Sequence, residues 1–173
     1  LRAIVAVANP KMVIAADPAL RKGLAAAPAD FGRDHADTAV IEPVIAPRWK
    51  AMSSGGSTGQ PKIIVAPGLN ALDPDRKPPL RFPAAGPILA TGPVYHNMPV
   101  TTNIQALFEG HSIVDMSRFD PEEALRLIDR FAIQWTSFVP TMMMRIWRLP
   151  DGVRANYDVS SLETVWHWAA PMP

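Results

Sequence analysis

Residues 88–168 alternate between short apolar runs, rich in β-branched or aromatic side chains, and longer stretches of helical character. The pattern predicts strands at Ile88–Val94, His111–Met116, Trp135–Val139 and Thr164–Trp168, and helices at Val100–Phe108, after Phe119 and at Thr141–Leu149. Strands that alternate with helices in this way form parallel βαβ units. We therefore expect an α/β fold with parallel βαβ units in residues 88–173.

The helix after Phe119 carries a clear start signal. Asp120 is a good N-cap residue, Pro121 suits the first helical position, and two glutamates follow in the first turn, near the positive end of the helix dipole. Its predicted buried face consists of Leu125, Ile128 and Phe131.

The first 87 residues are less regular. We expect the end of a helix at Leu1–Ala8, a strand at Lys11–Ala16, a helix at Pro18–Ala26, a loop at Ala27–Ala39 and an edge strand at Val40–Ile45. Six prolines among charged and small residues make 67–87 a predicted mobile surface segment.

The composition is that of a globular domain. The 173 residues are 48% hydrophobic and 19% charged, with a formal net charge of +1. This balance gives no electrostatic reason to expect a nucleic-acid partner, and no apolar run reaches the roughly 18–20 residues that span a bilayer. The absence of cysteine excludes disulfides and thiolate metal sites, and a cytoplasmic location is expected. Both ends look cut, so we interpret the chain as an internal piece of a longer protein.

A glycine-rich run at residues 53–62, SSGGSTGQPK, is the strongest indication of function. Glycines let backbone amides turn towards a ligand, and hydroxyls and Lys62 add donors and positive charge, so the run predicts a polyphosphate site. Three other interpretations of the run are less consistent with its residues. It is not a Walker loop, because Gln60 and Pro61 separate Gly59 from Lys62, and it lacks the spacing of a dinucleotide fingerprint. A flexible linker is disfavoured by the strands expected on both sides, at Trp49–Ser54 and Lys62–Ala66.

Ser54–Lys62 resembles the phosphate loop of the adenylate-forming (AMP-binding) superfamily, which includes acyl-CoA synthetases and amino-acid adenylation domains. Further segments resemble that family in the same order: Gly92–Asn97, Leu107–Ser112, Arg118–Leu125, Phe138–Met142, Leu162–Val165 and Ala169–Pro171. The details are most similar to fatty-acid or bile-acid type CoA ligases. The resemblance implies that 1–173 are a fragment of the large N-terminal domain, without the small C-terminal domain.

The resemblance implies a two-step reaction, in which ATP and a carboxylic acid give an acyl-adenylate and pyrophosphate, and CoA then takes the acyl group. Its implied catalytic residues are His96, beside the acyl carboxylate, and Lys62, on the phosphates. The implied nucleotide-binding residues are Ser54, Gly55, Gly56, Ser57, Thr58, Gly59, Gln60, Pro61 and Lys62 in the loop, and Ala169, Ala170 and Pro171 against adenine.

The implied cofactors are ATP, Mg²⁺ and CoA, although the family residue that helps to hold Mg²⁺ is expected beyond Pro173, so no metal ligand is assigned. Trp168 stands where the family usually has glycine. Met142, Met143 and Met144 suit an acyl channel, but a helix that buries some of them is the favoured interpretation.

The fragment alone is expected to be inactive. An amino-acid adenylation domain and a non-catalytic nucleotide-binding scaffold remain the alternatives.

Overall fold

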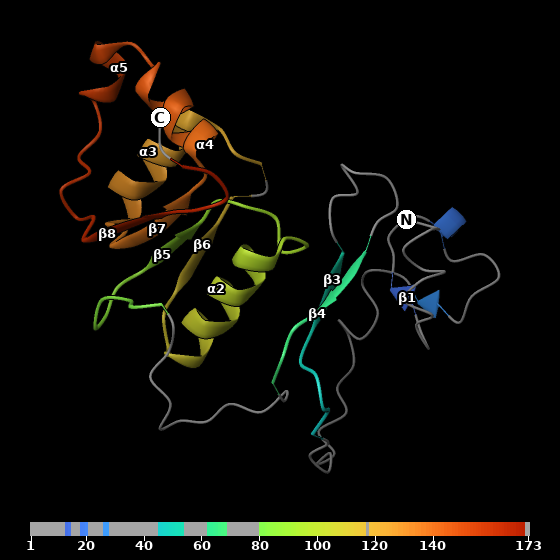
Figure 1. Cartoon of the computed structure of the whole chain (residues 1–173). Helices are drawn as coiled ribbons and strands as arrows, with labels where there is room; N and C mark the ends of the chain where they lie inside the picture. Colours follow the sequence, from blue (N-terminus) through green and yellow to red (C-terminus); the bar gives the residue numbers. More distant parts are fainter. Residues whose placement is uncertain are drawn as a thin grey trace. The chain divides into compact units, whose positions relative to one another are not determined.

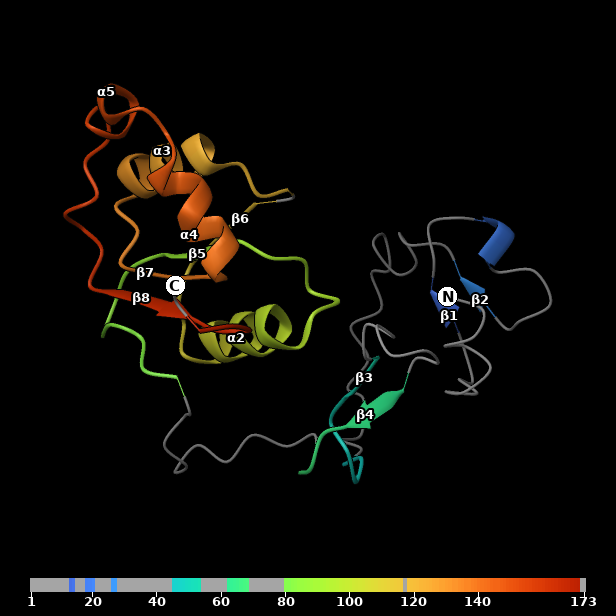
Figure 2. The same ribbon diagram turned by 45° about the horizontal axis from the view of Figure 1, so that its top comes forward.

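The computed structural model describes residues 13–14, 18–20, 26–27, 45–53, 62–68, 80–116 and 118–171. The chain divides into two compact units, Leu1–Asp73 and Pro74–Pro173. Figures 1 and 2 show the chain in two views. Each unit is described separately below.

The described part of the first unit contains two small pairs of strands and one 3₁₀ turn. The elements are β1 (Val13–Ile14), the 3₁₀ turn η1 (Pro18–Leu20), β2 (Ala26–Ala27), β3 (Ala51–Ser53) and β4 (Ile63–Val65). β1 pairs with β2 in parallel, and β3 pairs with β4 in antiparallel. Ser53 lies opposite Ile63, so this pairing brings the two ends of the glycine-rich run together. The prediction that the run joins two strands is confirmed.

Two predictions for the first unit differ from the structure, and a third is untested. The helix expected to continue to Ala26 is, in its described part, only the turn at Pro18–Leu20, and both Ala26 and Ala27 lie in β2 instead. Pairing with β1 overrides the weak local preference of this alanine-rich stretch. Ile45, the last residue of the expected edge strand, is not in a strand. The helix expected at Leu1–Ala8 lies outside the described residues.

The second unit contains a four-stranded parallel sheet with helices on both faces, which confirms the predicted α/β class. In chain order it contains β5 (Ile88–Ala90), α2 (Asn97–Phe108), β6 (Ile113–Asp115), α3 (Pro121–Phe131), β7 (Trp135–Phe138), α4 (Pro140–Trp147), α5 (Asp151–Arg154) and β8 (Thr164–His167). The strand order is β6-β5-β7-β8, and all three pairings are parallel.

Alternate side chains of the sheet enter two separate hydrophobic clusters. On one face, Leu89 and Phe138 pack with residues of α3 and α4, including Ile128 and Met143. On the other face, Ile88 and Trp135 pack with Ala106 of α2. Figure 1 accordingly shows α2 on one side of the sheet and α3 and α4 on the other.

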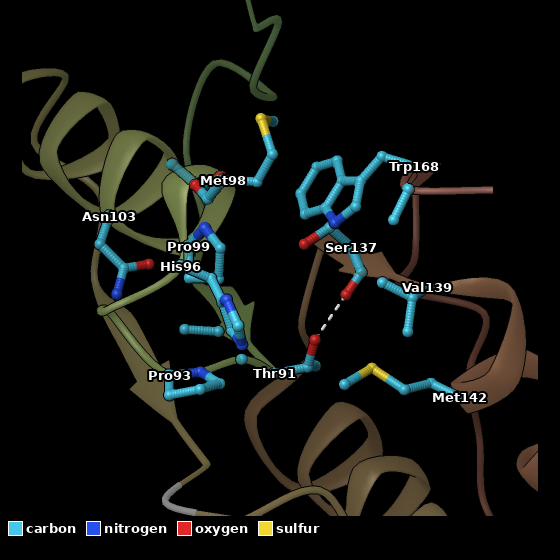
Figure 3. Close-up of a pocket in the computed structure, with 14 residues that line it drawn as sticks. Thr91, Pro93, His96, Met98, Pro99, Asn103, Ser137, Val139, Met142 and Trp168 are labelled. Carbon is cyan, nitrogen blue, oxygen red and sulfur yellow. Dashed lines mark hydrogen bonds between the residues drawn. The ribbon is translucent and has the colours of Figure 1, made fainter. Parts of the chain in front are cut away.

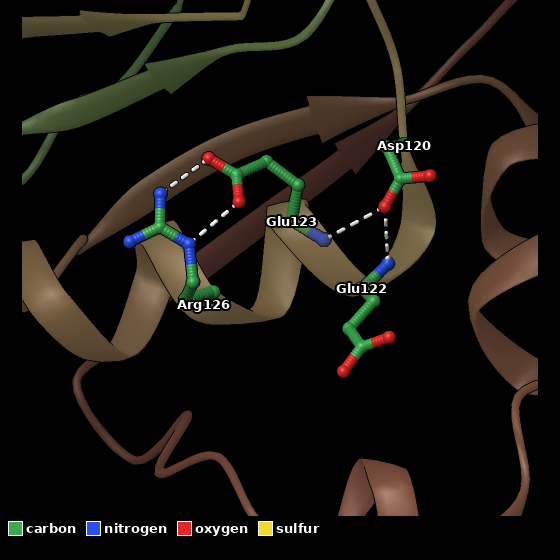
Figure 4. A network of polar contacts seen from close by, with 4 residues as sticks. All are labelled: Asp120, Glu122, Glu123 and Arg126. Atoms are coloured by element: carbon green, nitrogen blue, oxygen red, sulfur yellow. Dashed lines mark hydrogen bonds and ion pairs between the residues drawn. The ribbon is translucent and has the colours of Figure 1, made fainter.

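α3 begins as predicted (Figure 4). The Asp120 carboxylate accepts hydrogen bonds from the backbone amides of Glu122 and Glu123, at 3.1 and 2.9 Å. Arg126 donates to both carboxylate oxygens of Glu123, at 2.6 and 2.5 Å. The predicted burial of Leu125 and Ile128 is confirmed, whereas that of Phe131 is wrong. The helix ends at Phe131 and Ala132 is left-handed, with φ 47°, so Phe131 stays 41% exposed, with Arg130 over its ring.

The last part of the proline-rich segment 67–87 belongs to the second unit and packs against α2 and the sheet; Leu80 is buried, whereas residues 81–87 are exposed or half-buried as expected of a surface segment. Leu80 is only 3% exposed, and its carbonyl accepts a hydrogen bond from Gln105 Nε2 at 2.7 Å. Phe82 meets the fully buried Trp135 edge-on, with ring centroids 4.8 Å apart. His111 Nδ1 lies 3.0 Å from the carbonyl oxygen of Gly86. Apolar contacts with α2 and the sheet, which are not visible in the local sequence, hold this stretch.

Candidate functional site

A cavity of about 390 Å³ opens at the carboxyl ends of β5 and β7. The chain leaves β5 for β6 on one side and then returns to β7 on the other side of β5, so these two neighbours mark the point where the strand order reverses. In open parallel sheets, ligands bind at this switch point because the connections on its two sides diverge. The topology therefore singles out this cavity as the candidate site.

Three parts of the chain line the cavity. The lining residues are Ala90, Thr91, Gly92, Pro93 and His96, at the last residue of β5 and after it; Met98, Pro99, Thr102 and Asn103 in α2; and Ser137, Val139, Met142, Trp168 and Ala169 at the ends of β7 and β8 and in α4. Figure 3 shows most of these side chains around the opening. Apolar side chains predominate, and none of the lining residues is Asp, Glu, Lys or Arg.

His96 lies at the entrance to α2, where it is the N-cap residue. Its backbone amide donates to the carbonyl of Pro93 at 3.0 Å, and its carbonyl accepts from the amide of Val100 at 3.3 Å, which fixes the backbone on both sides. The imidazole is exposed, lines the cavity and lies 4.6 Å from the ring of Tyr95. The structure thus places His96, a predicted catalytic residue, at the rim of the cavity.

The start of α2 has no capping side chain, so its first backbone amides are not satisfied by a cap of this kind. Pro99 is tolerated in the first turn because an amide there has no partner within the helix. The first turn also lies close to the chain that leaves β5, since a Cβ added to Gly92 would come within 2.9 Å of Pro99 Cγ. Gly92 therefore sets how near the helix start lies to the sheet.

Hydroxyl groups at the strand ends hold the floor of the cavity. Thr91 is buried and donates through Oγ1 to the carbonyl of Ser137 at 2.6 Å, which ties the end of β5 to the end of β7 (Figure 3). Thr102 is buried as well and donates to the carbonyl of Met98 at 2.9 Å. Sequence reasoning missed Thr91, Ser137 and Asn103. For Thr91 and Ser137, the position at a strand end was the available signal, but which strands are neighbours is not a local property; Asn103 lies within α2, and no local signal marks it.

The segment after β8 is only partly at the cavity. Ala169, a predicted adenine contact, lines it and has a left-handed φ of 71°. Ala170 and Pro171 are exposed and are not among the lining residues. Trp168 lines the cavity and also packs against the cluster around Ile88 and Trp135.

The other predicted residues lie elsewhere. Lys62 is exposed directly before β4 in the first unit, and Ser54–Pro61 are outside the described residues, so the predicted role of the loop and of Lys62 is untested. The favoured interpretation of the methionines is confirmed: Met142 and Met143 both pack on the core, and Met142 also lines the cavity. Of the remaining described histidines, His111 is buried and His167 is exposed on β8.

No group of three or more His, Asp or Glu side chains among the described residues could hold a metal ion. None of the helices in the described ranges is both long enough and apolar enough to cross a membrane.

Comparison with known proteins extends these observations. The family model described as AMP-binding enzyme matches residues 50–173. A 4-coumarate–CoA ligase, CCL1, from Humulus lupulus is 32% identical over 127 residues, which are 69% of this chain and 23% of that protein. The medium/long-chain-fatty-acid–CoA ligase FadD8 of Mycobacterium tuberculosis is 29% identical over 119 residues, 68% of this chain and 20% of that protein. The chain thus spans less than a quarter of the length of these relatives.

Solved structures agree on the fold. The inhibitor-bound N-terminal domain of FACL13 from Mycobacterium tuberculosis has a TM-score of 0.72 at 21% identity, and covers 98% of this chain and 47% of that one. The O-succinylbenzoate coenzyme A synthetase MenE of Bacillus subtilis, in complex with AMP, has a TM-score of 0.70 at 17% identity, with 97% and 45% covered. At these identities the likeness establishes a shared fold.

Proposed function

The chain belongs to the family of AMP-binding enzymes, and on that premise we propose that it is part of an ATP-dependent acyl-CoA synthetase. In the proposed reaction, the carboxylate of an organic acid attacks the α-phosphorus of ATP, and the bond to pyrophosphate breaks. The acyl-adenylate then reacts with the thiol of CoA, which releases AMP and leaves a thioester. We further propose that residues 1–173 belong to the large N-terminal domain of this enzyme, and that the reaction takes place in the cytoplasm.

The observation that carries the proposal is the cavity at the β5–β7 switch point, with His96 at its rim and an apolar interior. An organic acid needs two environments: hydrogen-bond donors for its carboxylate and apolar side chains around its hydrocarbon part. His96 and the uncapped amides of α2 supply the first, because the positive end of a helix dipole favours an anion. Met98, Val139 and Met142 supply part of the second.

The same cavity argues against the amino-acid alternative. The ammonium group of an amino acid would lose its hydration on entering the cavity, which is costly unless a carboxylate pairs with it. No Asp or Glu is among the lining residues of the described chain. The apolar lining therefore favours an acid whose body carries no charge.

The proposed role of the glycine-rich loop is to hold the outer phosphates of ATP. Its residue types fit a polyphosphate, because hydroxyls, glycine amides and the Lys62 ammonium are all donors to anionic oxygens. The paired β3 and β4 keep the two ends of the loop together. In this role Lys62 stabilises the charge that develops on the leaving pyrophosphate. Ala169, Ala170 and Pro171 are proposed to border the adenine, and Mg²⁺ would add its own charge at the phosphates.

The intact protein, with ATP, Mg²⁺ and CoA, provides the test. A panel of carboxylic acids should elicit pyrophosphate and AMP, and each product should depend on the added acid. Release of inorganic phosphate without an acid would contradict the proposal. ATP binding without any acid-dependent pyrophosphate would favour the alternative of a non-catalytic scaffold.

Two substitutions with matched controls test the named residues. His96→Ala and Lys62→Ala should each lower the rate of adenylate formation by about 10²–10³-fold, the loss typical of one stabilising donor. His167→Ala, which removes an exposed histidine outside the cavity lining, and Lys50→Ala, next to β3, should stay near the wild-type rate. Equal losses in a variant and its control would remove the assigned role.

A further inference from the structure

Trp168 brings the largest aromatic side chain to the cavity lining. It directly follows β8 and is half-buried, and its ring packs against the cluster of Ile88, Ala106 and Trp135. Ala169, the next residue, has a left-handed φ of 71°. A non-glycine residue adopts this conformation at a cost, and it marks a turn of the chain directly after Trp168. The position of the indole is set by its packing on the core cluster.

The first turn of α2 lies across the cavity from the indole. Figure 3 shows the indole on one side and His96 and Pro99 on the other, with Met98 at the upper end. A ligand whose carboxylate lies at His96 would thus place its body beside the indole. Thr91 and Ser137 close the floor through their hydrogen bond.

We propose, building on the proposed function, that Trp168 makes this site selective for acids that carry a flat aromatic ring. A planar ring can stack in an offset arrangement on the indole or meet it edge-on, and gains more than its buried area alone provides. A saturated ring of the same size has no such term and is thicker. The substrate class is therefore arylalkanoic acids rather than saturated acids of matched length.

The test compares two acids that share a carboxylate and a chain length, 3-phenylpropanoic acid and 3-cyclohexylpropanoic acid. The intact protein is assayed in two ways: kcat/KM for acid-dependent pyrophosphate release, and direct binding of each acid by calorimetry. The wild type should prefer the phenyl acid by roughly 2- to 12-fold in both assays, the range that an aromatic pair supplies.

Three variants assign this preference to one side chain. Trp168→Leu should reduce the ratio between the two acids to about one, and Trp168→Phe, which keeps a ring at the position and protects the packing, should retain a preference. The matched control is Trp166→Leu, because Trp166 lies on β8 two positions earlier but is outside the cavity lining. It should keep the wild-type ratio.

The outcomes separate the two proposals. Pyrophosphate release with equal use of both acids, or a preference that survives in Trp168→Leu, overturns the selectivity and leaves the proposed function intact. A binding preference that depends on Trp168, without pyrophosphate release from any acid, supports the aromatic site and overturns the function. If no acid causes pyrophosphate release and the two acids bind equally well, both proposals are overturned.

Discussion

Gly86 occupies a position that accepts no side chain without a shift of its neighbours. Its φ is +110°, and an added Cβ would lie 1.9 Å from Oε1 of Gln134. We predict that Gly86→Ala lowers the free energy of unfolding by about 1–3 kcal/mol, because backbone strain and a steric clash act together. Urea unfolding of the variant measures this. Gly152→Ala is the control, since a Cβ there meets nothing within 4 Å, and its effect should be at most about 1 kcal/mol in the stabilising direction. Equal destabilisation by both variants would contradict the prediction.

The pair of Glu123 and Arg126 should make stability depend on pH in a defined direction. The hydrogen bonds from Arg126 hold the pKa of Glu123 below its usual value. The unfolded chain therefore binds the proton more readily, so the contribution of the pair is present above the ordinary pKa of glutamate and is lost as the pH falls through the lowered pKa of the folded state.

Arg126→Gln should accordingly reduce the urea midpoint near neutral pH, and the difference from wild type should shrink as the solution becomes acidic. The effect will be small because both side chains are largely in solvent. In a Glu123→Gln background, which lacks the titrating group, adding Arg126→Gln should change the urea midpoint by an amount that does not depend on pH. A difference that stays constant with pH would rule out this linkage.

At the scale of single elements, α3 depends on its cap. Asp120→Ala removes the acceptor for two backbone amides, and should cost about 0.5–2 kcal/mol of unfolding free energy. Asp120→Ser restores an acceptor and should recover most of that loss. Hydrogen exchange at the amides of Glu122 and Glu123 gives a local measurement. Equal exchange in the Ala and Ser variants would show that the cap contributes little.

The same helix shows what could be predicted from sequence. Asp120, Pro121 and the following glutamates are local signals, and the structure has the helix start where they place it. α2 begins at Asn97, three residues before the predicted start at Val100. The prediction was late because a proline usually interrupts a helix, whereas Pro99 is tolerated in the first turn. α5 was not predicted, since Pro150, Asp151 and Gly152 together are more typical of a turn.

The candidate site was only partly predictable for a related reason. His96 was identified because its segment has a family pattern. The hydrogen bond from Thr91 to the carbonyl of Ser137 spans 46 residues, and no local pattern shows that the ends of β5 and β7 are neighbours. The packing of Trp168 against the cluster that contains Ile88 joins residues still further apart in sequence. Local propensity predicts the elements, whereas the cavity depends on their order in the sheet.

At the scale of the whole chain, β8 forms one edge of the described sheet. Among the described strands it pairs only with β7, and its Val165 and Trp166 are 41% and 36% exposed. An exposed apolar edge is a template for another strand, and a lysine on it opposes that pairing. We predict that the 173-residue chain associates as its concentration rises, and that Val165→Lys weakens the association, as measured by light scattering after gel filtration.

The control for this prediction is Val159→Lys. Val159 is similarly exposed, at 40%, but is not part of a strand, so a charge there should leave association unchanged. If both lysine variants reduce association equally, general charge repulsion is the cause. The edge of β8 would then have no special role.

The strand order also affects the order in which contacts form during folding. Contacts within β5-α2-β6 close a short loop: His111 meets Gly86 across 25 residues. The central pairing of β5 with β7 closes a longer one, since Thr136 donates to the carbonyl of Leu89 across 47 residues. Longer loops carry a larger entropic cost and more distant contacts form more slowly. We therefore expect the cavity between β5 and β7 to form late during refolding, so that recovery of ligand binding lags behind recovery of helical signal.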